Sequence, residues 1–187
     1  MDLNRLTEQS QEGLRRAQAL AVRRHHQGID DAHLLAALLE DTSGLAAGCL
    51  AAAGIAPSMV RERVEQELNA IPQVSGPGME AQQVYFTQRL ARLLAQAEDE
   101  AKALQDEYVS VEHLLLAMLG DERGAVGGLL RSLGLTRERL LAAIKKIRGG
   151  QRVTSPNPET TYQALERRPR SHHAGQPRKT RPGDRTG

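Results

Sequence analysis

The sequence repeats itself with a shift of 80 residues, and this internal repeat limits the folds that the chain can adopt. The two halves match without gaps, mainly at apolar positions and at glycines, where packing and backbone shape are decided. Each half is therefore one supersecondary unit, and two such units can bury their apolar faces against each other. The identical pairs include Leu14/Leu94, Ala17/Ala97, Ala21/Ala101, His33/His113, Leu34/Leu114, Leu35/Leu115, Ala37/Ala117, Leu39/Leu119, Asp41/Asp121, Gly44/Gly124, Gly48/Gly128, Leu50/Leu130 and Gly54/Gly134.

Each half has the pattern of four helices. Thr7 predicts a helix start, because a hydroxyl can cap the exposed N–H groups of a first turn. Apolar residues then recur at helical spacing through Leu14, Ala17 and Ala21. In the first half, the first helix is expected to end at Gly28. The second is opened by Asp30 and Asp31 and broken by Thr42, Ser43 and Gly44. The third covers Leu45–Ala53 and is closed by Gly54, and the fourth runs from Pro57 to about Asn69. The corresponding helices in the second half are expected at about 86–105, 110–119, 123–133 and 136–148.

Aromatic residues make up only 2% of the chain, so the core must be built from Leu, Ala, Val and Ile, which suits closely packed helices. We therefore predict an all-α fold, an eight-helix pseudo-twofold bundle made of two tandem four-helix repeats. Repeat one covers about 5–71 and repeat two about 85–148, joined by a Pro- and Gly-rich connector over 72–83. The domain is expected to end at Gly149 and Gly150, and 151–187 to form a linker and a basic, disordered tail.

Charge separates the tail from the body. Residues 167–187 carry seven Lys or Arg and one Asp, a net charge of +6, whereas the whole chain carries +2 and the remaining residues therefore −4. The acidic body and the scarcity of aromatic residues argue against a nucleic-acid reader. The basic tail by itself permits binding to a polyanion.

No catalytic or cofactor motif is present in the sequence. The phosphate-binding pattern G-x-x-x-x-G-K-[ST] does not occur, so we expect no ATPase activity, no enzyme function and no cofactor. The adjacent histidine pairs, His25/His26 and His172/His173, point about 100° apart on a helix and are interpreted as solvated rather than metal-binding. The acidic clusters 98–100 and 106–107 are interpreted as a solvated face, and His33 as a capping or packing group like its repeat equivalent.

Cys49 is the only cysteine, so an internal disulfide is impossible and a reducing compartment is expected. Its small apolar neighbours indicate a buried thiol. The sequence has neither the ~20 consecutive apolar residues of a membrane helix nor the layout of a secretory signal. These features predict a cytoplasmic protein that does not associate with membranes.

Four segments resemble a known family. The start DLNRLTEQSQEGLRRAQALA, the connector IPQVSG, the segment DEYVSVEHLLLAML and the stretch RGGQRVTSPNPETTYQALE are similar to the Clp N-terminal domain with its double Clp repeat, of the ClpB disaggregase type. The resemblance covers residues 1–166. In that family a helical linker and two ATPase modules follow, and this chain departs at that point, before the first ATPase module.

The departure has a candidate explanation in the genetic code. Read one base downstream, with allowed third-base choices, the codons from Arg168 to the end permit the string GRDLTTLASQGKLDPVIGR, which resembles the family's own linker. Our hypothesis is that the tail is a frameshifted reading, which sequencing of the coding DNA across codons 165–187 tests. The alternative is a disordered basic extension.

The resemblance implies a function. It implies the substrate-capturing domain of a disaggregase chaperone, in a stress response, which binds unfolded or aggregated polypeptide and contacts full-length hexamers of the ClpB type. The alternatives are an adaptor-docking domain of a proteolytic Clp ATPase and a polyanion binder acting through the tail.

The resemblance also implies site residues. The polar ones are Thr7, Asp106 and Glu112. The groove positions are Gln96, Glu100 and His113, where the family more often has leucines, and the apolar part of the groove then falls on Leu93, Leu104 and Tyr108. The simpler interpretation makes Thr7 an N-cap and Asp106 and Glu112 surface charges.

Overall fold

The computed structural model describes residues 2–74 and 83–158. Over these ranges the chain forms eight α-helices, a short 3-10 helix and two very short strands, which confirms the predicted all-α fold. In the first repeat, η1 (Leu3–Arg5), α1 (Glu8–Arg23), β1 (Gly28–Ile29), α2 (Asp31–Leu38), α3 (Leu45–Ala52) and α4 (Pro57–Asn69) follow one another. In the second repeat the order is β2 (Tyr85–Phe86), α5 (Gln88–Ala103), α6 (Val111–Gly120), α7 (Ala125–Ser132) and α8 (Arg137–Arg148).

The two repeats are related by the shift seen in the sequence. Adding 80 to the bounds of α1 and α3 gives the bounds of α5 and α7. The segments that lead into the helices cross between repeats: Ile29 pairs with Phe86 in a parallel ladder, and Leu6 forms a parallel bridge with Val109. These two pairings are equivalent under the shift, so each repeat is completed by a backbone segment of the other.

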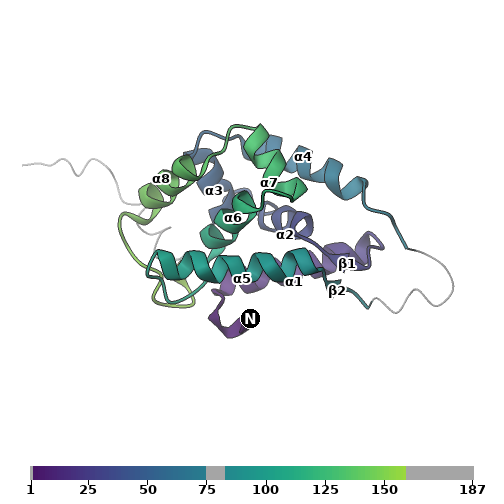
Figure 1. Ribbon diagram of the computed structural model, residues 1–187, viewed down its shortest axis with the longest axis horizontal. Helices are drawn as coiled ribbons and strands as arrows, with labels where there is room; N and C mark the ends of the chain where they lie inside the picture. The colour runs from purple at the N-terminus through teal and green to yellow at the C-terminus, as the bar shows by residue number, and fades with distance from the viewer. Residues whose placement is uncertain (1, 75–82, 159–187) are drawn as a thin grey trace, which may run out of the picture.

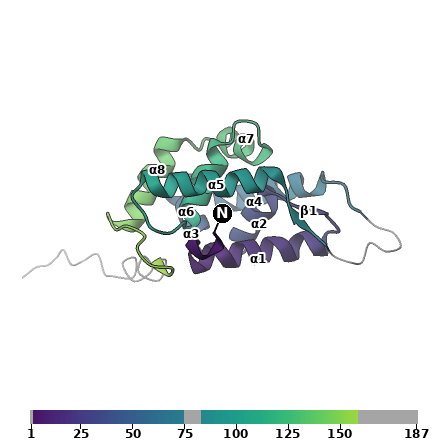
Figure 2. The same cartoon turned by 60° about the horizontal axis from the view of Figure 1, so that its bottom comes forward.

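Helices α2 and α6 form the centre of the molecule. Figure 1 shows α1 and α5 below them and the other four helices above them, and in Figure 2 α1 and α5 run roughly parallel across the front of the molecule. Among the other four, α3 packs against α8 and α4 against α7, which again joins the two repeats. Every residue of α6 except Gly120 is buried, and Cys49 of α3 is fully buried as predicted.

The helix ends follow the predicted local rules. The Thr7 side chain caps α1 by accepting a hydrogen bond from Ser10 N at 3.2 Å. Gly54 and Gly134 close α3 and α7 with φ of +86° and +100°, a conformation that a residue without Cβ adopts easily. Pro57 is the first residue of α4.

The predicted end of the first helix at Gly28 is wrong. Helix α1 ends at Arg23, and the chain turns at His25, which has a φ of +60°. The backbone N–H of His26 donates to Ala21 O at 2.9 Å and that of His25 to Val22 O at 3.1 Å, the two bonds of a Schellman motif. This turn brings the His26 side chain into the interior, where it is 3% exposed, so the prediction of a solvated pair is wrong for His26.

The packed body extends beyond Gly149 and Gly150, where we expected it to end. Val153 is fully buried, and its carbonyl accepts a hydrogen bond from Glu107 N at 2.8 Å. The Pro156 carbonyl accepts one from Glu8 N, at the start of α1, at 2.7 Å. We call residues 151–158 the strap. The tail from 159 onward and the middle of the connector lie outside the described residues.

Candidate functional site

A buried polar network lies where α5, α6, α8 and the strap meet. Its centre is Asp106, whose side chain is fully buried in the turn after α5. The Asp106 Oδ2 atom accepts a hydrogen bond from Arg148 Nη2 at 2.8 Å and lies 2.7 Å from His113 Nε2, while Oδ1 accepts one from Val153 N at 2.9 Å. A carboxylate with three such donors can remain ionised away from water.

His113 is the third residue of α6, and its ring bridges the helix start and Asp106. The Nδ1 atom accepts a hydrogen bond from Ser110 N at 2.8 Å. Because Nδ1 is an acceptor, the hydrogen-bond network assigns the proton to Nε2, which then donates to Asp106. The histidine therefore fixes the position of the aspartate relative to the first turn of α6.

Arg148 closes the network from the last residue of α8. Its Nε donates to Glu112 Oε2 at 3.1 Å, so one guanidinium joins Asp106 and Glu112. Burial alone would raise the pKa of Asp106, but hydrogen bonds from His113, Val153 N–H and Arg148 outweigh it and hold that pKa below its ordinary value. The other oxygen of Glu112, Oε1, is buried without a hydrogen-bond partner in the described part of the chain.

The structure therefore brings together three of the expected site residues, Asp106, Glu112 and His113, but places them inside the protein. The interpretation of Asp106 and Glu112 as surface charges is wrong, because both side chains are at most 1% exposed. Thr7 is also fully buried; its Oγ1 donates to Ser10 Oγ at 3.0 Å, and its backbone N–H donates to Val109 O, next to α6. The N-cap interpretation of Thr7 is confirmed.

The other expected positions lie along α5. Gln96 and Glu100 of α5 and its C-cap Leu104 recur every four residues and so lie on one face. Gln96 is exposed and Leu104 half-buried, and Tyr108, just after the helix, is half-buried as well. Leu93 is 4% exposed and belongs to the core.

Glu100 forms an ion pair across this face. Arg137 of α8 donates to both of its carboxylate oxygens, at 2.7 and 2.8 Å, and this guanidinium holds the pKa of Glu100 below its ordinary value. The residue is 6% exposed, so the prediction of a solvated acidic face is wrong for Glu100 as it is for Asp106.

Sequence reasoning missed two members of the network, Arg148 and Val153. A signal for Arg148 existed: the buried residues of α8 are Leu140, Ala143, Ile144 and Arg148, so the arginine continues an apolar stripe at helical spacing. Val153 carried no such signal, because it lies in an extended segment whose position depends on the folded body.

Two further searches concern the described residues alone. Between residues 2 and 74 and between 83 and 158, no group of three or more His, Cys, Asp or Glu side chains has an arrangement that could hold a metal ion. No helix in the same ranges has the length and apolar character needed to cross a membrane.

Comparison with known proteins agrees with the fold. Residues 5–133 match the family model of the Clp repeat (R) N-terminal domain. The chain is 44% identical over 167 residues to the chaperone protein ClpB of Bacillus cereus, and 42% identical over 168 residues to that of Nitratidesulfovibrio vulgaris. Each alignment covers 89% of this chain but 19% of the relative, so the chain spans about a fifth of the length of these proteins.

Solved structures show the same architecture. The N-terminal domain of Hsp104 from Candida albicans matches with a TM-score of 0.69 at 21% identity, over 82% of this chain and 98% of that one. The N-terminal domain of the ClpV1 ATPase from Escherichia coli matches with a TM-score of 0.67 at 23% identity, over 84% and 92%. With the family model matched over most of the folded body and ClpB chaperones as its curated relatives, this chain belongs to the Clp repeat (R) N-terminal domain family.

Proposed function

We propose that this chain is a non-catalytic, cytoplasmic module that captures unfolded or aggregated polypeptide for a ClpB-type chaperone. Support comes from its membership of the Clp N-domain family and its identity of 44% to a ClpB chaperone. The chain spans only 19% of such a relative. In this proposal it supplies capture, and ATP-driven disaggregation is carried out by full-length hexamers that it contacts.

The observation that carries the proposal is the face of α5 described above. The Gln96 and Leu104 side chains, together with Tyr108, offer polar and apolar surface on either side of the Glu100–Arg137 ion pair. A shallow surface of this kind binds extended chains weakly and with little sequence preference, which suits first capture. We name Gln96, Glu100, Leu104 and Tyr108 the α5 face.

The buried residues then have a positioning role. Asp106, Glu112 and His113 are too deeply buried to contact a substrate directly, but with Arg148 they join α6 and α8 to the turn that carries Tyr108. Thr7 and Leu93 likewise support the surface from inside. In this proposal a change in the network alters the shape of the α5 face rather than deleting a contact.

Fluorescence anisotropy with fluorescein-labelled casein, an unfolded protein, tests the proposal. Tyr108→Ala and Leu104→Ala are expected to weaken saturable binding by about tenfold each, because each removes apolar contact area. Tyr85→Ala is the matched control, since Tyr85 is 60% exposed at the opposite end of α5. The proposal fails if the folded chain does not bind, or if the Tyr85 and Tyr108 variants bind equally.

A second candidate is docking to one defined partner segment, such as an adaptor. It is favoured by a solved complex of a ClpV N-domain with a VipB peptide, whose domain matches this chain with a TM-score of 0.63 at 22% identity. Competition separates the two functions. Unrelated unfolded proteins compete with casein for a general capture surface, whereas an adaptor site responds to one sequence only.

A further inference from the structure

The strap, residues 151–158, is held by the body as an extended peptide is held by a receptor. In Figure 1 it is the yellow-green segment at the left. Val153 N donates to Asp106 Oδ1 at 2.9 Å, and the Val153 carbonyl accepts from Glu107 N at 2.8 Å. The Val153 side chain is fully buried, whereas the residues on both sides of it are exposed. Main-chain hydrogen bonds around one buried side chain are the contacts by which proteins bind extended segments.

The contact of the strap continues to the start of α1. The Pro156 carbonyl accepts a hydrogen bond from Glu8 N, the first residue of that helix, at 2.7 Å. One extended segment therefore crosses from the turn between α5 and α6 in repeat two to repeat one. Tyr108 of the α5 face directly follows Glu107, so this contact is continuous with the proposed capture surface. We call Glu8, Asp106 and Glu107 the strap seat.

The link between α8 and the strap has the properties of a hinge. Gly149 is the C-cap of α8 with a φ of +62°, and Gly150 follows with a φ of +91°. A Cβ built on either glycine would meet no heavy atom of the described residues within 4 Å. Because glycine adopts many backbone conformations, rotation at these two positions moves the strap off its seat without moving α8.

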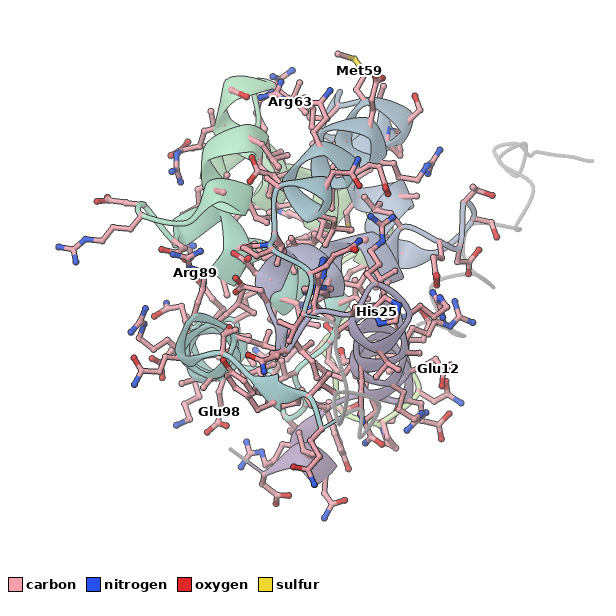
Figure 3. The ribbon with its side chains drawn as sticks, turned by 90° about the vertical axis from the view of Figure 1, so that its right-hand side faces the viewer. Glu12, His25, Met59, Arg63, Arg89 and Glu98 are labelled. Atoms are coloured by element: carbon pink, nitrogen blue, oxygen red, sulfur yellow. The ribbon has the colours of Figure 1, made fainter. Side chains whose placement is uncertain are left out.

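The equivalent turn of repeat one holds its following segment by a different contact. The shift of 80 relates Gln105 to His25, and both have a positive φ, of +61° and +60°. Figure 3 looks onto the end of the molecule that carries His25, opposite to the strap in Figure 1. There Val74 N donates to the His25 carbonyl at 2.7 Å, and residue 26 is a histidine that faces His33. The carboxylate that accepts a strap N–H is thus a feature of repeat two.

We propose that the strap seat binds extended segments of unfolded polypeptide with a valine-sized apolar residue, and that the strap is an internal occupant which such a segment displaces. The incoming main chain donates to Asp106 and accepts from Glu107 N, and its apolar side chain fills the place of Val153. Asp106 becomes accessible only after the strap leaves, so it is buried while the strap is seated.

The tether makes this exchange depend on the local supply of extended chain. A tethered strap competes at an effective concentration on the order of millimolar, so a dilute peptide displaces it poorly. An aggregate presents many extended segments close together and competes better. The inference rests on the proposed capture function and adds to it a second, regulated contact beside the α5 face.

A peptide copy of the strap tests the inference. Fluorescein-labelled QRVTSPNP, the sequence of residues 151–158, is titrated by anisotropy into the full chain and into Val153→Asp, whose new charge beside Asp106 releases the strap. The peptide is expected to bind this variant about tenfold more tightly than the wild type, because its seat is vacant. Thr154→Asp adds the same charge at the exposed next position and is expected to bind as the wild type does.

Two further comparisons make the result decisive. A peptide with aspartate in place of its valine is expected to bind the Val153→Asp variant about tenfold more weakly than QRVTSPNP. If Val153→Asp does not fold, Val153→Ser replaces it, since serine also loses the buried apolar contact. Equal peptide binding by the wild type and the folded variant overturns the inference.

Casein binding distinguishes a displaceable occupant from a mere support of the α5 face. Release of an occupant is expected to tighten casein binding by Val153→Asp about tenfold, because the seat is open to the incoming chain. Loss of a support weakens it instead. In a chain that binds casein, weaker or unchanged binding by the variant overturns the inference.

The outcomes also separate the strap seat from the proposed function. Casein binding that depends on Tyr108, without peptide binding to Val153→Asp, retains the capture function and overturns the strap seat. Peptide binding that Val153→Asp enhances, in a chain that binds no casein, supports the strap seat and overturns general capture.

Discussion

His33 and His113 hold the same position in the two repeats, as third residues of α2 and α6, but their Nε2 atoms face different partners. In each ring Nδ1 accepts a hydrogen bond from the backbone N–H three residues earlier, at 2.9 and 2.8 Å. His33 Nε2 lies 2.8 Å from His26 Nδ1, whereas His113 Nε2 lies 2.7 Å from Asp106 Oδ2. Residues 26 and 106 are themselves equivalent under the shift of 80. A histidine at this position makes a neutral pair in repeat one, and an aspartate makes a charged network in repeat two.

The neutral pair predicts acid sensitivity. Burial, and then the neighbouring His26, lower the pKa of His33 to about 4. The unfolded chain accepts this proton near pH 6.5, so the stability contributed by neutral His33 is complete above that pH and is lost as the pH falls toward 4. His33→Gln keeps an acceptor for the helix start and removes the titration. Urea unfolding at pH 7 and 4.5 is expected to show a loss smaller by about 2 kcal/mol in the variant.

His25→Gln is the control for this experiment, because His25 is exposed and lies next to the buried His26 in the sequence. It is expected to leave the difference between the two pH values unchanged. A wild-type protein that loses no more stability than the His33 variant contradicts the prediction.

A carboxylate with the opposite pH dependence lies at Asp31. This residue is 2% exposed, its Oδ2 has no hydrogen-bond partner among the described residues, and its repeat equivalent is Val111. Burial, and then the charge of Asp30, raise the pKa of Asp31 to about 7. The folded protein keeps the proton that the unfolded chain releases near pH 3.8, so stability falls as the pH rises from there through about 7.

Asp31→Val is therefore expected to stabilise the protein at pH 8 by about 1–3 kcal/mol and by less at pH 5. Urea unfolding at both pH values measures the difference. The explanation through burial of the charge is refuted if the gain is the same at pH 5 and pH 8.

Removal of Arg148 is expected to destabilise the fold strongly. Arg148→Met leaves Asp106 and Glu112 buried without their shared cation, which costs about 3–5 kcal/mol. Lys145→Met, on the exposed side of the same helix, changes stability by no more than about 0.5 kcal/mol. Denaturant unfolding of both variants tests the prediction, and similar losses in the two would show that the network does not hold α8.

The strap is expected to contribute to folding. Val153→Ala removes buried methyl groups and should cost about 1–3 kcal/mol, whereas Thr154→Ala, at the exposed next position, should cost less than about 0.5 kcal/mol. Thermal and urea unfolding of the full chain measure both. A neutral Val153→Ala would place the end of the stable domain before the strap.

Cys49 is expected to be unreactive in the folded protein. Burial first, and the charge of Glu112 next, raise the pKa of its thiol above the ordinary value, and the side chain is fully buried. Labelling with a chromogenic disulfide reagent should proceed at the rate of unfolding in buffer and rapidly in urea. Fast labelling of the native protein would contradict this.

The sequence by itself determined the repeat, the order of the helices and most of their ends. Those features depend on neighbours in the chain: Thr7 caps the helix that follows it, Gly54 supplies a left-handed turn, and Pro57 starts a helix. The end of α1 was misjudged because a histidine, not the nearest glycine, takes the positive φ there. His25 accepts that conformation because the two hydrogen bonds of the turn are formed and His26 is packed in the interior.

Only the tertiary structure decided which charged residues are buried. Asp106, Glu112 and Glu100 look like solvated acids in the sequence, but α8 of the same repeat folds back over them and brings Arg148 and Arg137 to within hydrogen-bonding distance. Burial and charge pairing join residues far apart in the chain, so no local pattern specifies them.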